Sequence, residues 1–131
     1  MTNKKTWTVL IVDDEPPVRE LERRILGLGP YQVLEAANAR EAFSILQSGQ
    51  HVDLLIADLD MPELTGEEMV LRIRAARPGQ KVLYVSGNVD RLLDARKILG
   101  DGEAFVDKPF TPKALLEGVS LLLFDTLTPP R

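Results

Sequence analysis

The chain alternates short apolar segments with segments of helical periodicity five times, and this order constrains its fold more than any other feature. Apolar runs such as residues 8–12 and 54–57 are each followed by a stretch whose apolar residues recur at helical spacing. When strands and helices alternate in this way, each helix carries the chain back across the sheet, and the next strand lies parallel to the last. The sequence therefore predicts an α/β fold built on a parallel sheet.

Five strands are expected, and their apolar composition is typical of strands that are buried on both faces. They are residues 8–12, 32–36, 54–57, 81–85 and 104–106. Together with five helices in about 120 residues, they predict a flavodoxin-like three-layer sandwich with strand order 2-1-3-4-5. We expect a single domain over residues 1–131, with its core at residues 7–125 and a tail or linker stub at 126–131.

The first helix is expected to bury an apolar stripe against the sheet. The stripe consists of residues at helical spacing, with the charged residues between them turned away. Its members are Val18, Leu21, Ile25 and Leu28.

Capping residues indicate where the other helices begin. Asn38 and Thr65 each precede a helical segment and are followed three residues later by a glutamate, as in a capping box. A weaker fourth helix is expected over residues 89–99. The fifth begins at Pro112, with Thr111 as its cap.

The fifth helix is apolar on two sides. One stripe is expected to face the core, and it comprises Leu115, Leu116, Val119, Leu122 and Leu123. Leu121 and Phe124 fall on the opposite side of the helix, where they are expected to meet solvent. We interpret this second face as a contact for a homodimer partner or a neighbouring domain; the alternative is that the tail folds over it.

Charge and residue inventory exclude several classes of function. A net charge of −4 without a basic run argues against nucleic acid as a partner, because binding to phosphates depends on clustered Lys and Arg. The chain has no cysteine, so thiolate sites are excluded. Its one histidine, His51, is expected at the surface, and a single histidine cannot form a histidine cluster. The apolar run after the N-terminal lysines is too short for a signal peptide or membrane span, so a cytoplasmic location is expected.

Polar residues stand where the predicted strands end. In chain order they are Asp13 and Asp14, Asp58, Ser86 and Lys108. Because the carboxyl ends of parallel strands meet at one edge of a sheet, we expect three carboxylates, a hydroxyl and an ammonium to lie together there.

Three carboxylates at one edge require a counter-charge. Two like charges about 4 Å apart repel each other by roughly 4 kcal/mol at an effective dielectric near 20. Lys108 alone cannot balance three acids, whereas Mg²⁺ binds one or two carboxylates and leaves positions for water and phosphoryl oxygens. With a carboxylate nucleophile, an ammonium and a hydroxyl, the set meets the requirements of phosphoryl transfer.

Four short segments at these strand ends resemble the receiver domains of bacterial response regulators. They are Ile11-Val12-Asp13-Asp14-Glu15, Asp58-Leu59-Asp60-Met61-Pro62 with Gly66 beyond it, Ser86-Gly87, and Lys108-Pro109-Phe110. The resemblance covers residues 7–125 and is greatest to receivers attached to hybrid sensor histidine kinases.

The resemblance implies that Asp58 accepts a phosphoryl group from a histidine kinase or a histidine phosphotransfer protein. Asp13, Asp14 and Asp58 would hold Mg²⁺ together with the backbone carbonyl of Asp60. The Asp60 side chain departs from the commoner choices of the family, since it adds a fourth carboxylate beside the site.

The resemblance also implies a switch. Ser86 and Lys108 would bind phosphoryl oxygens, and Phe105 would turn inward as the Ser86 hydroxyl moves toward the phosphate. The Lys108-Pro109 bond resembles one that the family holds cis. The responsive surface would comprise the fourth helix, fifth strand and fifth helix.

Two other functions remain open at this point. Asp58-Leu59-Asp60 after a strand imitates the nucleophile and acid of haloacid-dehalogenase-like phosphatases, although that family places its pair after the first strand. A pseudo-receiver that only binds partners is the second alternative. The preferred hypothesis is a phosphoacceptor that turns over no external substrate.

Overall fold

The computed structural model describes residues 6–62, 64–88 and 102–130 of the 131-residue chain. Within them, five parallel strands form one sheet in the order β2-β1-β3-β4-β5, which confirms the predicted flavodoxin-like topology. The strands are β1 Trp7–Val12, β2 Tyr31–Ala36, β3 Leu54–Asp58, β4 Lys81–Ser86 and β5 Glu103–Asp107. They extend the predicted ranges by one or two residues at most.

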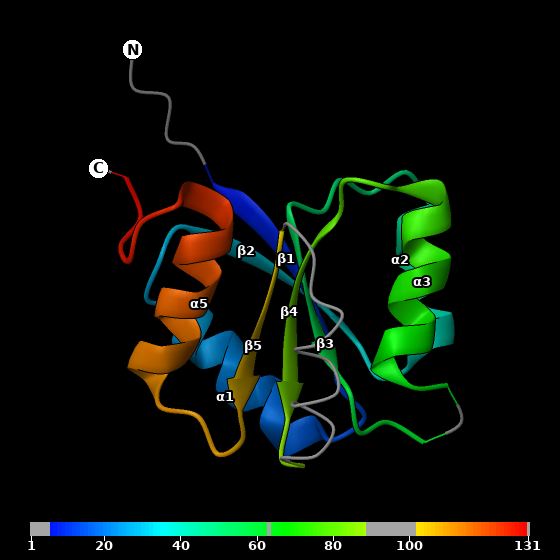
Figure 1. Cartoon of the computed structure of the whole chain (residues 1–131), viewed down its shortest axis with the longest axis horizontal. Helices are drawn as coiled ribbons and strands as arrows, with labels where there is room; N and C mark the ends of the chain where they lie inside the picture. Colours follow the sequence, from blue (N-terminus) through cyan, green and yellow to red (C-terminus); the bar gives the residue numbers. More distant parts are fainter. Residues whose placement is uncertain (1–5, 63, 89–101, 131) are drawn as a thin grey trace.

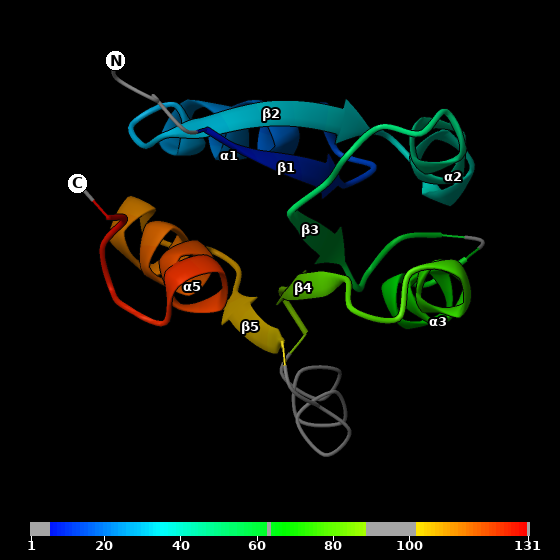
Figure 2. The same ribbon diagram turned by 90° about the horizontal axis from the view of Figure 1, so that it is seen from above.

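The described residues contain four helices: α1 Pro16–Leu26, α2 Ala39–Gln47, α3 Gly66–Ala76 and α5 Pro112–Phe124. Figures 1 and 2 show α2 and α3 on one side of the sheet and α1 and α5 on the other, which gives the three predicted layers. The fourth helix expected over residues 89–99 lies outside the described residues. None of the helices described is long and apolar enough to cross a bilayer.

Alternate residues of the central strands supply two cores, one on each face of the sheet. Leu10 and Val12 of β1 pack in the cluster beneath α2 and α3, whereas Val9 and Ile11 pack in the cluster beneath α1 and α5. This division follows from the two-residue period of a strand. Burial on both faces holds for β1, β3 and β4 but was wrong for β2 and β5, because edge strands have a neighbour on one side only.

The predicted helix caps are confirmed. The side chains of Asn38, Thr65 and Thr111 each accept a hydrogen bond from the backbone N–H three residues later, at 2.9, 3.3 and 3.0 Å. These bonds satisfy N–H groups that the first turn of a helix leaves without a partner.

The stripe predicted for α1 was wrong in part. Leu21 is 47% exposed and Leu28, which lies beyond the end of the helix, is 75% exposed. Ile25 is buried as predicted, and it is joined by Glu22 and Leu26. Glu22, Ile25 and Leu26 occupy positions i, i+3 and i+4. Periodicity sets the width of such a stripe, but packing against the sheet sets which way the helix is turned.

The second face of α5 is smaller than predicted. Leu121 is 45% exposed, as expected. Phe124 is not free, because Trp7 at the start of β1 packs against it edge to face, with ring centroids 4.6 Å apart and an interplanar angle of 77°. A residue from near the other end of the chain therefore covers part of Phe124.

Candidate functional site

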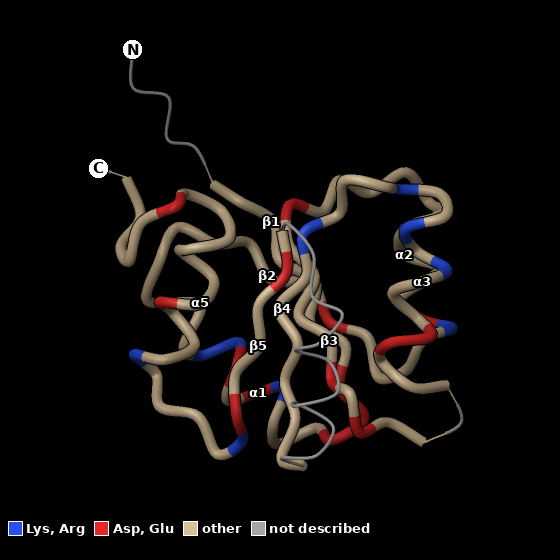
Figure 3. Tube along the Cα trace, viewed as in Figure 1, with Lys and Arg blue, Asp and Glu red and all other residues tan. Residues whose placement is uncertain are grey.

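The carboxyl ends of the strands bring the predicted site residues together, and Figure 3 shows acidic positions gathered at this edge of the sheet. Carboxylate oxygens of Asp13, Asp14 and Asp58 all lie within 4.8 Å of one another. Asp13 and Asp58 are buried, whereas Asp14 is exposed. The cluster is thus walled by the sheet and open to solvent on the side of Asp14.

Lys108 lies between two of these acids. Its Nζ is 3.2 Å from Asp13 Oδ2 and 3.4 Å from Asp58 Oδ2. The Lys108 N–H donates to the carbonyl of Ser86 at 2.9 Å, and the Lys108-Pro109 bond is cis, as the resemblance implied. One ammonium is therefore shared by two buried carboxylates, so the cluster keeps a net negative charge.

The oxygen atoms of Asp58 have different surroundings. Asp58 Oδ1 accepts the N–H of Asp60 at 2.9 Å. Asp58 Oδ2 is buried and accepts no hydrogen bond from the described part of the chain, although Lys108 Nζ is near it. A buried carboxylate oxygen without a donor is costly. Three converging carboxylates with one such oxygen fit a hard divalent cation that prefers oxygen ligands.

Asp58 and Lys108 both remain charged near neutral pH, although burial acts against the charge of each. Burial raises the pKa of Asp58 to about 6, the N–H of Asp60 opposes this rise, and Asp13 adds to it. Burial also lowers the pKa of Lys108, but Asp58 and Asp13 outweigh this effect, so that its pKa lies above the ordinary value. Asp58 is thus mostly a carboxylate at pH 7, and Lys108 is an ammonium.

Ser86 is held by the side chain of Asp60. The Ser86 hydroxyl donates to the Asp60 carboxylate, at 2.8 Å from each oxygen, and the Gly87 N–H donates to Asp60 Oδ2 at 3.0 Å. The resemblance implied a role for Asp60 through its backbone carbonyl and placed its carboxylate only beside the site. The bond to Ser86 was missed, because the order of the strands predicts which residues share an edge of the sheet but not which side chains pair there.

Phe105 is half-buried in β5 and packs against the cluster beneath α2 and α3. On the neighbouring strand, the Tyr84 hydroxyl donates to Glu103 Oε2 at 2.6 Å, and Arg74 Nη1 lies 2.8 Å from the same oxygen. This network joins α3, β4 and β5 beside Phe105. No sequence pattern predicts it, because its residues come from three separate elements.

Glu22 of α1 is a buried acid that the sequence analysis did not predict. It is 1% exposed, and its Oε2 accepts no hydrogen bond from the residues that the structure describes. Burial raises the pKa of Glu22 to about 8, and Asp13 adds to this effect. Glu22 is therefore mostly protonated at neutral pH.

Gly66 allows α3 to begin directly against the end of β3. A Cβ atom at this position would lie 2.5 Å from the Asp58 carbonyl oxygen and 3.1 Å from Leu59 Cα. Only glycine permits such an approach between two backbones, so Gly66 positions α3 against the end of β3.

We expect Gly66→Ala to lower the free energy of unfolding by about 2 kcal/mol or more, because backbone atoms must move apart to admit the methyl group. Urea unfolding followed by circular dichroism measures the change. Gly79→Ala is the matched control, since a Cβ there meets nothing within 4 Å. Equal stability of the two variants would contradict the close approach.

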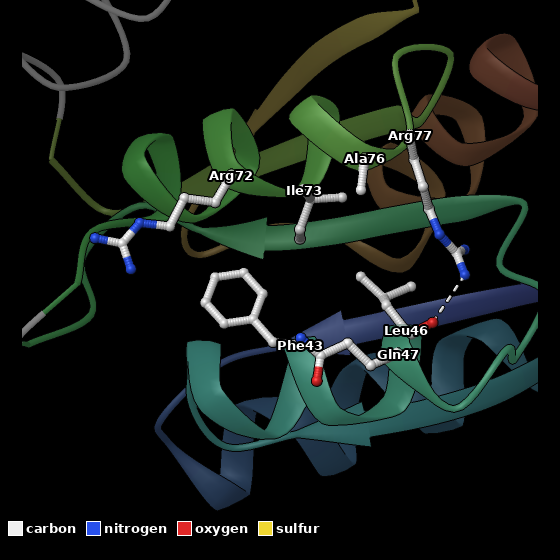
Figure 4. Close-up of a pocket in the computed structure, with 7 residues that line it drawn as sticks. All are labelled: Phe43, Leu46, Gln47, Arg72, Ile73, Ala76 and Arg77. Atoms are coloured by element: carbon white, nitrogen blue, oxygen red, sulfur yellow. Dashed lines mark hydrogen bonds between the residues drawn. The ribbon is translucent and has the colours of Figure 1, made fainter.

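A cavity of about 400 Å³ lies between α2 and α3, apart from the acidic cluster. Figure 4 shows Phe43 and Ile73 facing each other across it, with Arg77 at one end. Arg77 Nη2 donates to the carbonyls of Leu46 and Gln50, both at 3.1 Å. No predicted site residue lines this cavity. The hydrogen bond from Arg77, at the end of α3, to Leu46 of α2 links the two helices.

Comparison with known families identifies the family of the chain. The family described as response regulator receiver domain matches residues 9–120, a range that contains all the strand-end residues above. The chain belongs to the response regulator receiver domain family.

Relatives of this receiver domain include both kinases and single-domain regulators. The chain is 36% identical over 118 residues to the sensor kinase CckA of Brucella abortus, covering 88% of this chain and 12% of the kinase. It is 32% identical over 114 residues to a chemotaxis protein CheY homolog of Campylobacter jejuni, covering 83% of this chain and 86% of that protein. The resemblance to receivers of sensor kinases is thus confirmed, although the chain spans only about an eighth of CckA.

Solved structures agree with the fold. The response regulator TrrA of Thermotoga maritima, described in complex with Mg(2+)-BeF, has 31% sequence identity and a TM-score of 0.80, covering 90% of this chain and 100% of that one. The receiver fold of this chain is therefore shown by sequence and by structure.

Proposed function

We propose that this receiver takes a phosphoryl group onto Asp58 from a phosphohistidine of a histidine kinase or histidine phosphotransfer protein. The observation that carries the proposal is the convergence of Asp13, Asp14 and Asp58 within 4.8 Å, with Lys108 Nζ 3.4 Å from Asp58. The kinship to a sensor kinase supports the choice of donor.

In this reaction an Asp58 carboxylate oxygen attacks the phosphorus atom as the P–N bond of the donor breaks. The electron pair of that bond returns to the imidazole, which leaves as a neutral ring once a proton is available. Asp58 Oδ2 suits the role of nucleophile, because the Asp60 N–H binds Oδ1, whereas Oδ2 lies 3.4 Å from the Lys108 ammonium. The Lys108 ammonium pairs with charge that develops on the phosphoryl oxygens.

We propose Mg²⁺ as the cation of the acidic cluster. Asp13, Asp14 and Asp58, with the backbone carbonyl of Asp60, would hold it. Bound there, it would neutralise charge shared by the carboxylates and the phosphoryl oxygens.

Phosphorylation adds a charge of roughly −1.5 to −2, which Ser86 and Lys108 would hold. We propose that Ser86 and Phe105 then move together and alter a partner-binding surface. Shifting a two-state equilibrium from 1:99 to 99:1 takes about 5.5 kcal/mol of differential stabilisation, so specific contacts in one state must supply it.

The proposed surface comprises β5, α5 and the expected fourth helix, which lies outside the described residues. Exposed Leu121 supports a contact with a second copy or a neighbouring domain. Concentration-dependent sedimentation of the phosphorylated chain distinguishes a homodimer from a monomer. We place the receiver in the cytoplasm, without direct contact with nucleic acid or membrane, in keeping with its net charge of −4.

Incubation with a small acyl phosphate or phosphoramidate tests the function. In the presence of Mg²⁺ we expect an acid-stable, base-labile phosphoryl adduct, seen as a mass increase. No adduct should form when EDTA is present from the start. A generic phosphate ester should not be turned over. A folded chain that forms no adduct would indicate a pseudo-receiver, and steady ester hydrolysis would indicate a phosphatase.

A further inference from the structure

Asp60 connects the phosphoacceptor to the switch hydroxyl. Its N–H donates to Asp58 Oδ1 at 2.9 Å, while its carboxylate accepts the hydroxyl of Ser86 and the N–H of Gly87. Asp60 follows β3 and Ser86 ends β4, so this carboxylate ties together the loops that leave two neighbouring strands.

A serine hydroxyl has one proton to donate. In this structure Ser86 donates it to Asp60, while Ser86 Oγ accepts the N–H of Asn88 at 3.0 Å. Ser86 is 0% exposed, so bulk water cannot take the place of either partner. The Ser86 hydroxyl therefore cannot donate to a phosphoryl oxygen on Asp58 while it donates to Asp60.

We propose that Asp60 is a positioning residue that competes with the phosphoryl group for the Ser86 hydroxyl. The inference rests on the proposed function of Asp58 and adds a regulator to it. Asp60 stabilises the unphosphorylated arrangement through its bond from Ser86, and the switched arrangement must give that bond up. Asp60 therefore sets how far phosphorylation shifts the equilibrium.

Binding of beryllofluoride, a phosphoryl analogue, at saturating Mg²⁺ measures this competition without a kinase. We expect Asp60→Ala to bind it more tightly than the wild type, because no bond to Ser86 has to be broken. Removal of a negative charge beside the site also strengthens binding of an anion, so the single variant does not separate the two effects.

A double-mutant cycle with Ser86→Ala separates them. The gain in beryllofluoride affinity on Asp60→Ala should be about fivefold larger when Ser86 is present than when it is replaced. This is the ratio expected from one net hydrogen bond. Asp60→Asn is the matched control, since it removes the charge but keeps an oxygen that can accept from Ser86. The change in beryllofluoride affinity on Asp60→Asn should depend less on the presence of Ser86 than the change on Asp60→Ala does.

A second readout uses no bound analogue. Backbone amide resonances of β5, residues 103–107, should lie nearer to their beryllofluoride-bound positions in free Asp60→Ala than in the free wild type. Equal gains with and without Ser86 would show that Asp60 acts by charge alone and would overturn the inference while leaving the proposed function intact. A folded wild type that binds no beryllofluoride with Mg²⁺ would instead overturn the proposed function and, with it, the inference.

Discussion

Asp58→Asn is expected to lower phosphoryl uptake from a small phosphodonor by a factor of at least about 100, because an amide oxygen is a much weaker nucleophile than a carboxylate. Asparagine has nearly the size of aspartate and keeps an oxygen that can accept the N–H of Asp60. The fold should therefore persist, and the loss should reflect chemistry. Intact-mass spectrometry after incubation with Mg²⁺ and the donor measures the adduct.

Asp125→Asn is the control for Asp58→Asn. Asp125 caps the end of α5 in the left-handed conformation, with φ 59°, which asparagine also adopts readily. We expect this variant to be phosphorylated like the wild type. An adduct that persists in Asp58→Asn would place the acceptor on another acid, with Asp13 the first to examine because it shares Lys108 with Asp58.

Glu22→Gln is expected to stabilise the protein by about 2 kcal/mol or more at pH 8, because folding raises the pKa of this carboxyl from 4.5 to about 8. Between these two values the folded chain keeps a proton that the unfolded chain releases. The unfolded state is therefore favoured progressively as the pH rises through this window. Glutamine carries no such proton and removes that part of the pH dependence.

Urea unfolding at pH 4.5 and pH 8 measures the effect of Glu22→Gln. The difference from the wild type should be small at the lower pH and should grow as the pH rises. Glu20→Gln is the matched control on the same helix, where an exposed ion pair with Arg24 contributes less than about 1 kcal/mol. A wild type whose stability relative to Glu22→Gln is the same at both pH values would show that Glu22 is not buried as a neutral acid.

The positions of the strands and of the helix caps followed from the sequence. The apolar segment of β3 and the capping residues Asn38 and Thr65 act locally, through burial and through hydrogen bonds that span three residues. The alternation of elements then implied a parallel sheet, and the sheet implied that Asp13 and Asp58 would meet at one edge. Such predictions need only the chain order and the two structural periods of strand and helix.

Contacts between elements could not be predicted in the same way. Residues with no spacing relation decide them: Trp7 covers Phe124, and Asp60 accepts the Ser86 hydroxyl. The rotation of α1, which buries Glu22 and exposes Leu21, depends on how the helix packs against the sheet.

The sequence by itself thus determined the family, the order of the strands and the edge at which the acids gather. Tertiary structure alone decided which side chain accepts the Ser86 hydroxyl and which glutamate is buried. The reason is that periodicity and capping are short-range properties of one segment. Hydrogen bonding across loops and desolvation depend on the three-dimensional neighbours that each side chain acquires.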